Sequence, residues 1–168
     1  MELQKKLENL YLILNEEFKL YKYICNISDQ KTQIIVKGKI KELEDIMKLE
    51  KDFVVKIEKL EELRERLVQI IAKKIEINAD KINITTILKS LKDTEIKLKL
   101  KNIQNKTIEV IQKLKNINEI NSKLIKNSID YVDFSINILS NDDEGNNNYG
   151  NTGSINKPKK RVYFDRRY

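Results

Sequence analysis

Few side chains in this sequence have the chemistry to transform a substrate. Two pairs of adjacent carboxylates, Glu16–Glu17 and Glu61–Glu62, and one thiol, Cys25, are the main candidates. Adjacent residues on a helix point to different faces, so neither carboxylate pair can work as a general acid and base. The sequence contains no His, which removes imidazole catalysis and every zinc site built from Cys and His. We expect no catalytic residue, no metal ion and no cofactor.

Two amide side chains are better suited to binding than to catalysis. Asn118 and Asn121 are three residues apart, which places them on nearly the same face of a helix. A buried Asn can fix the register of packed helices, and two neighbouring amides can instead hydrogen-bond the backbone of a docked helix. Both explanations stay open on the residues alone. Cys25 has the character of a small buried hydrophobic residue.

The composition predicts an all-α fold. The 168 residues include four Gly and one Pro, too few for the turns of an all-β sandwich or barrel. Charged residues make up 35% and hydrophobic residues 40%, as in proteins built from long helices. The net charge is 33 − 26 = +7, and most of the basic residues are Lys. Because Arg is scarce, a nucleic-acid partner is the weakest hypothesis, and we expect the charge to cover solvated helix faces.

Hydrophobic spacing predicts a helical hairpin. A first helix is expected over 2–36 and a second over 40–75, and Gly38 between them is a helix-ending signal. The short turn makes the two helices antiparallel neighbours. Alternating spacings of three and four predict the residues of the seam between them, with Glu50 and Arg64 as polar interruptions. The apolar seam residues are Leu3, Leu7, Leu10, Leu14, Phe18, Tyr21, Cys25, Leu43, Ile46, Phe53, Ile57, Leu60, Leu67 and Ile71.

A connector and a long third helix are expected next. Residues 76–93 break the periodicity, and Thr85 or Thr86 is the expected cap of one or two helical turns there. The third helix is expected over 94–139, completing a coiled-coil-like three-helix bundle within 1–139. Its first apolar row consists of Ile96, Leu100, Ile103, Val110, Leu114, Ile117, Leu124, Tyr131 and Ile138. A second row consists of Ile108, Ile111, Ile120, Ile125, Ile129, Val132, Ile136 and Leu139.

The width of this apolar face has two explanations. In the N-terminal half of the third helix, we expect both rows to fill the groove between the other two helices. From Leu124 to Leu139 the rows stay dense, and a surface reserved for another chain is a fair alternative there.

The last segment, 140–168, is predicted to be a disordered tail. It is rich in Asn and Asp and has almost nothing to bury. Its aromatic residues are unusual for a spacer and are typical of short recognition elements, because a ring buries much area in a small contact. They are Tyr149, Tyr163, Phe164 and Tyr168. The basic run 157–161 is expected to be a solubilising part of the tail.

The sequence also suggests a cellular compartment. No apolar run resembles a signal peptide or a membrane span, so direct membrane insertion is not expected. A single cysteine cannot form an intramolecular disulfide, which fits a reducing compartment. We therefore expect a cytoplasmic protein.

Four motifs together resemble the FlgN family of flagellar export chaperones. The turn at 36–44 is similar to the hairpin turn of that family. Residues Leu114, Asn118, Asn121 and Leu124 match its Leu-x-x-x-Asn-x-x-Asn-x-x-Leu signature, and 131–139 resembles the end of its third helix. Tyr149, Gly150 and Gly153 match the Tyr-Gly-x-x-Gly motif of its tail, and 164–167 is similar to tails in the family.

The resemblance implies a function without chemistry. Such chaperones bind the C-terminal segments of the hook–filament junction proteins FlgK and FlgL, prevent their premature association, and deliver them to the flagellar type III export gate. The gate component is the cytoplasmic domain of FlhA. The resemblance assigns gate docking to Tyr149, Gly150 and Gly153. It assigns the junction proteins to a helix face formed by Asn118, Asn121, Leu124, Ile125, Ser128, Ile129 and Val132. The alternative is a structural coiled-coil adaptor that homo-oligomerises through the same seams.

Overall fold

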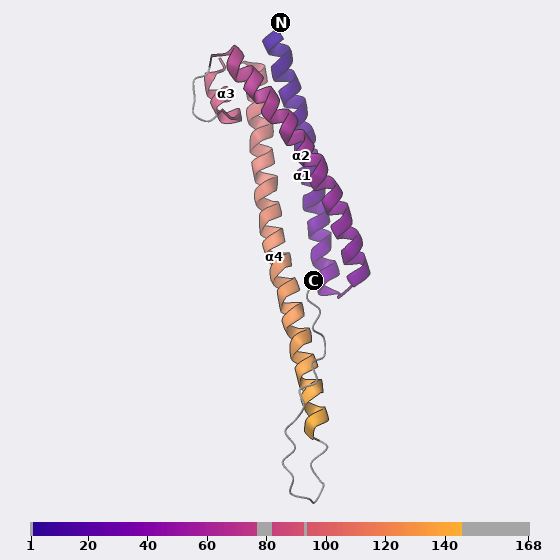
Figure 1. Ribbon diagram of the computed structural model, residues 1–168. Coiled ribbons are helices and arrows are strands. Elements are labelled where there is room, and N and C mark those ends of the chain that lie inside the picture. Colours follow the sequence, from indigo (N-terminus) through magenta and orange to yellow (C-terminus); the bar gives the residue numbers. More distant parts are fainter. Residues whose placement is uncertain (1, 77–81, 93, 146–168) are drawn as a thin grey trace, which may run out of the picture. The chain divides into compact units, whose positions relative to one another are not determined.

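The computed structural model describes residues 2–76, 82–92 and 94–145. This part of the chain is all-helical, as predicted, and contains four helices and no strand (Figure 1). The helices are α1 (Glu2–Val36), α2 (Ile40–Lys74), α3 (Ile84–Ser90) and α4 (Glu95–Gly145). Two compact units divide the chain, Met1–Ser128 and Ile129–Tyr168, and α4 supplies helix to both.

Gly38 ends α1 by adopting a backbone conformation that other residues avoid. Its φ is +63°, in the left-handed region. The Gly38 amide donates to the Ile35 carbonyl at 3.0 Å, and the Lys39 amide donates to the Ile34 carbonyl at 3.1 Å. This pair of bonds is a Schellman motif, which satisfies carbonyls that the helix end leaves open. The helix therefore stops at Val36, and α2 returns along α1 as an antiparallel hairpin (Figure 1).

Polar groups on α1 contact Glu50 and Arg64, the two polar residues that interrupt the apolar seam of α2. Arg64 Nε lies 3.4 Å from Glu17 Oε1. Glu50 accepts hydrogen bonds from Ser28 Oγ at 2.7 Å and from Lys31 Nζ at 2.6 Å. Sliding one helix along the other would separate these partners inside the interface, so the polar groups fix the register of the hairpin.

The connector holds a short helix whose cap differs from the expected one. Asn83, which reads as a break in the pattern, is the N-cap of α3. Its side chain accepts from the Thr86 amide at 2.9 Å, and the Thr86 hydroxyl accepts from the Asn83 amide at 3.0 Å. The expectation that Thr85 or Thr86 is the cap is wrong, because Thr86 occupies the third helical position and completes a capping box.

One hydrophobic cluster joins all four helices. It consists of buried residues from each of them: Leu7, Leu10, Leu14, Val68, Ile71, Ile84, Ile87, Leu88, Ile96, Leu100 and Ile103. Each such side chain stabilises the fold by about 1.5–3 kcal/mol when fully buried. The prediction that Cys25 is buried is also confirmed.

Within the first unit, α4 runs in the same direction as α1. The start of α1, at Leu7 to Leu14, shares the core cluster with the start of α4, at Ile96 to Ile103. Further along both helices, Asn121 Nδ2 donates to the Ser28 carbonyl. The two contacts follow the same order in α1 and α4, which makes the helices parallel. In the structure α4 continues to Gly145, beyond the expected end at Leu139.

Candidate functional site

One line of residues along α4 passes from the core to the surface. Residues 18 apart lie five turns from each other on a straight α-helix and so share one face. Ile103 and Asn121 are only 5% and 2% exposed, whereas Leu139 is 69% exposed. The apolar positions of α4 thus continue along its whole length, whereas burial is found in the first unit and exposure in the second.

The exposed part of this helix is densely apolar. Every large hydrophobic side chain between residues 129 and 140 is at least 46% exposed. These side chains are Ile129, Tyr131, Val132, Phe134, Ile136, Ile138 and Leu139. We call residues 129–140 the apolar segment. Ile129, Val132, Ile136 and Leu139 share one side of the helix, and the other three lie on the opposite side. Exposed apolar side chains at this density are typical of helices that bind another chain.

The seven residues expected to bind a partner lie in different environments. Asn118, Ser128, Ile129 and Val132 are exposed, and Leu124 and Ile125 are half-buried. Asn121 is buried. The Ser128 hydroxyl donates to the Leu124 carbonyl at 2.9 Å, within its own helix. Of the seven, Ile129 and Val132 belong to the apolar segment.

Asn121 is engaged inside the protein. Its Nδ2 donates to the Ser28 carbonyl at 2.9 Å, and its Oδ1 accepts from the Thr32 hydroxyl at 2.7 Å. Both partners belong to α1. The geometry favours the first of the two explanations for this Asn, in which the amide fixes the register of packed helices. Asn118, one turn away, is exposed to solvent.

The second apolar row of α4 is exposed even in the N-terminal half. Ile108, Ile111 and Ile120 are 55%, 40% and 51% exposed. The expectation that both rows fill a groove there is wrong, because only the first row, with Ile103 and Ile117, is buried. A seven-residue repeat drifts by about 20° per heptad on a straight helix. Consequently the angular position of the first row on α4 shifts steadily from one heptad to the next.

Acidic side chains accompany the apolar segment. Asp130 and Asp133 are exposed. No Lys or Arg occurs between residues 127 and 156 of the sequence, although the chain as a whole has a net charge of +7. The net charge of the whole chain hides this acidic stretch, which a count of charges in local windows of the sequence reveals.

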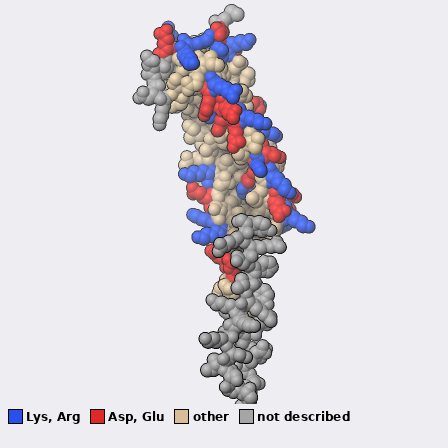
Figure 2. Space-filling model, in the orientation of Figure 1, with Lys and Arg blue, Asp and Glu red and all other residues tan. Residues whose placement is uncertain are grey.

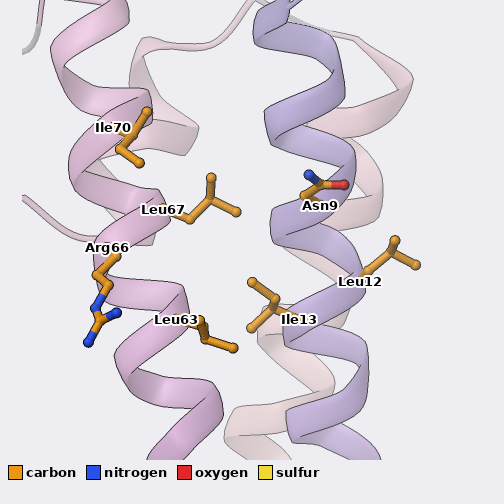
Figure 3. A pocket seen from close by; sticks show the side chains of 7 residues that line it. All are labelled: Asn9, Leu12, Ile13, Leu63, Arg66, Leu67 and Ile70. Atoms are coloured by element: carbon orange, nitrogen blue, oxygen red, sulfur yellow. The ribbon is translucent and has the colours of Figure 1, made fainter.

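A second apolar surface lies on the hairpin. Leu63 and Leu67 of α2 and Ile13 of α1 point into the space between the two helices (Figure 3). The groove has a volume of about 410 Å³ and is also lined by Asn9, Leu12, Arg66 and Ile70. The predicted seam does not include this groove, because Leu12, Leu63 and Ile70 fall outside the seam positions.

The most perturbed titratable groups lie between α1 and α2. Glu17 is 1% exposed, and burial raises its pKa to about 7 although the charge of Arg64 opposes that shift. Within the part of the chain that the structure describes, Glu17 Oε1 accepts no hydrogen bond. Tyr21 donates to Glu61 at 3.0 Å, and burial together with this bond raises the pKa of Tyr21 to about 12. This cluster is far along the chain from the apolar segment, so we assign it to the hairpin.

The charged surface shows no concentrated patch on the visible face. Basic and acidic side chains are interspersed there (Figure 2). Among residues 2–76, 82–92 and 94–145, no group of His, Cys, Asp or Glu side chains could hold a metal ion. None of the helices in the described residues has a stretch long and apolar enough to span a membrane. Tyr149, Gly150 and Gly153, expected to dock on the export gate, lie outside the described residues.

A comparison with protein-family models identifies the family. The family model for the FlgN protein matches residues 1–157, which include the apolar segment and Tyr149. A curated relative, "Uncharacterized protein YvyG" of Bacillus subtilis (strain 168), is 25% identical over 140 residues. That match covers 83% of this chain and 84% of the relative. No solved structure matches this chain.

Proposed function

Because this chain belongs to the FlgN family of flagellar export chaperones, we propose that it binds hook–filament junction proteins in the cytoplasm. Its partners are the C-terminal segments of FlgK and FlgL, which it keeps from associating before export. It then delivers them to the cytoplasmic domain of FlhA at the flagellar type III export gate. The chain acts by binding alone, as a chaperone and without catalysis.

The apolar segment of α4 is the observation that carries this proposal. Ile129 and Val132 are 56% and 52% exposed, on a helix face that is buried farther back at Asn121. An amphipathic helix of a junction protein would cover this face by helix-in-groove packing. Leu124 and Ile125, half-buried beside it, would extend the contact toward Asn118. Within the first unit, the long helices α1, α2 and α4 would act together as a three-helix bundle.

Delivery to the gate is assigned to the tail. Tyr149 follows the apolar segment closely in the chain, so it can reach a second partner while the helix holds the first. A single ring can anchor a small, transient interface. Gly150 and Gly153 would let the backbone approach the gate closely.

A structural adaptor that homo-oligomerises is the second candidate. The same exposed apolar segment could pair with that of another copy, as in a coiled coil. The two functions differ in what the free protein does. An adaptor forms a stable oligomer without any other protein, whereas a chaperone forms a defined complex only when a junction protein is added.

The test places a charge on the apolar segment. In the double variant Ile129→Asp, Val132→Asp, a bound helix would bury two unpaired carboxylates, which is costly. We expect at least a tenfold loss of affinity for both junction proteins in calorimetric titrations, equal to about 1.4 kcal/mol. Circular dichroism should stay unchanged, because neither side chain is part of the buried core.

Ile108→Asp is the matched control. Ile108 is 55% exposed on the same helix but lies outside the apolar segment. Its variant should bind the junction proteins normally. Full binding by the double variant, with native circular dichroism, would place the partner surface elsewhere.

A further inference from the structure

We propose that the apolar segment of α4, residues 129–140, is the docking surface for the chain's own last residues, 157–168. The segment presents seven exposed apolar side chains, and two exposed carboxylates accompany them. Among the described residues nothing covers it, and the sequence that follows contains a stretch of complementary chemistry.

Charge complementarity selects this occupant. Asp130 and Asp133 are exposed on the apolar segment, and residues 127–156 contain no Lys or Arg. The last residues have the opposite composition, with one acidic residue, Asp165, against a larger basic set. The basic residues are Lys157, Lys159, Lys160, Arg161, Arg166 and Arg167. Opposite charges this dense on one chain attract each other strongly until salt screens them, over about 8–10 Å at physiological ionic strength.

Apolar groups complete the match. Tyr163, Phe164 and Tyr168 stand among these basic residues. Aromatic rings bury much area for little loss of conformational entropy, so they are suited to cover Ile129, Val132 and their neighbours. The basic run 157–161 would thus take part in binding, in addition to keeping the tail soluble.

The spacer has the right length. About 11 residues, 146–156, join the end of α4 to the basic stretch, and a flexible chain of that length spans roughly 17–20 Å on average. The apolar segment itself is about 18 Å long, at 1.5 Å per residue. A tether that matches the distance raises the effective concentration of the tail at the helix to the order of 1 mM.

Such a cover has a consequence for any helix that binds the same face. That helix must displace the tail. Its apparent association constant is therefore the intrinsic association constant multiplied by the fraction of molecules in which the face is uncovered. The cover needs no partner protein, and it can therefore be tested on the free chain.

The experiment uses tryptophan as a reporter, since the chain contains none. Ile136→Trp places an indole on the apolar segment, on the same side of the helix as Ile129 and Val132, at a position that is 52% exposed. We expect its emission maximum at low salt to lie at a shorter wavelength than that of free tryptophan, because the tail shields it. Ending the chain at Asn156, or adding 0.5 M NaCl, should move the maximum to longer wavelength. Leu98→Trp, at a site on α4 that is 67% exposed among lysines, should respond to neither change.

Charge exchange tests the recognition itself. Reversing Asp130 and Asp133 to Lys should release the tail, and so should reversing 157–161 at its four basic positions to Glu. Combining the two sets should restore the shielding, which separates a pairing between them from two independent effects. Equal emission of Ile136→Trp with and without 157–168 would overturn the proposal. So would a shift that grows with protein concentration, which would identify a second copy as the occupant.

Discussion

The side-chain amide of Asn121 donates a hydrogen bond to the main-chain carbonyl of Ser28 at 2.9 Å. This bond joins α4 to α1 at a point where both residues are fully buried. The Ser28 hydroxyl donates to Glu50 of α2 at 2.7 Å. One residue of α1 is therefore linked to both of the other long helices, through its backbone on one side and its side chain on the other.

Replacing Asn121 should affect folding more than binding. In Asn121→Ala the Ser28 carbonyl loses a donor in a buried site, which costs about 1–3 kcal/mol. Urea unfolding followed by circular dichroism should show a stability loss in this range. Asn118→Ala is the matched control, because its side chain is exposed and should change stability by less than about 0.5 kcal/mol. Equal losses in the two variants would contradict the register role of Asn121.

The buried Glu17 should make the stability of the protein depend on pH. Burial raises its pKa from an ordinary 4.5 to about 7, so the folded state favours the protonated form. The stabilisation from protonation is complete below pH 4.5 and is lost as pH rises toward 7. Glu17→Gln should remove this dependence and raise the stability at pH 8 by roughly 1–3 kcal/mol.

The measurement is thermal unfolding of wild type and Glu17→Gln at pH 5 and pH 8. The two proteins should differ little at pH 5 and clearly at pH 8. A variant less stable than wild type at pH 8 would show that the attraction of Arg64 outweighs the burial cost. Glu16→Gln, at the exposed neighbouring position, is the control and should change neither value by much.

The capping box of α3 should be worth a measurable amount of stability. Asn83→Ala removes the acceptor of the Thr86 amide, and loss of an N-cap costs about 1 kcal/mol. Asn83→Ser keeps a capping oxygen and should retain most of the stability. Urea midpoints of the three proteins give the comparison, and an Ala variant as stable as the Ser variant would rule out the cap as a stabilising contact.

Tyr149→Ala should separate the two proposed binding steps. We expect unchanged binding of junction proteins and docking of the loaded chaperone on the FlhA cytoplasmic domain weakened about tenfold or more, as for an anchor residue. Two titrations on the variant measure this, with Tyr163→Ala as a second tail tyrosine for comparison. If substrate binding falls while gate docking holds, the division of labour between helix and tail is wrong.

Periodicity in the sequence was enough to predict which faces of the hairpin meet. Leu7, Leu10 and Leu14 repeat at spacings that only a lengthwise helix contact explains, and Gly38 has few roles other than ending a helix. The cap of α3 could not be predicted with the same ease. Asn is common both in loops that interrupt helices and at helix N-caps. Only the hydrogen bond that the Asn83 side chain accepts from the Thr86 amide identifies this Asn as an N-cap.

The sequence predicts which side of the helix is apolar, but it does not predict which part of that side is exposed to solvent. A row of apolar residues predicts that one side of a helix packs against another element. It does not predict which part of that side is covered. Ile103 and Leu139 both belong to apolar rows of the same helix, yet one is 5% exposed and the other 69%. Exposure depends on which other side chains pack against a residue, and the spacing of apolar residues along one helix does not give that. Asn121 and Asn118 likewise look alike in sequence and differ only in what α1 places opposite them.

The polar groups inside the hairpin also determine which other helices can replace its members. A foreign helix that set a leucine against Glu17 or Glu50 would leave a buried carboxylate without its partner, at a cost of order 3–5 kcal/mol. The pairing of α1 with α2 is thereby protected against exchange with other amphipathic helices. A helix that packs on the exposed apolar side chains of α4 or of the hairpin groove would meet no such cost, whereas a helix that took the place of α1 or α2 would.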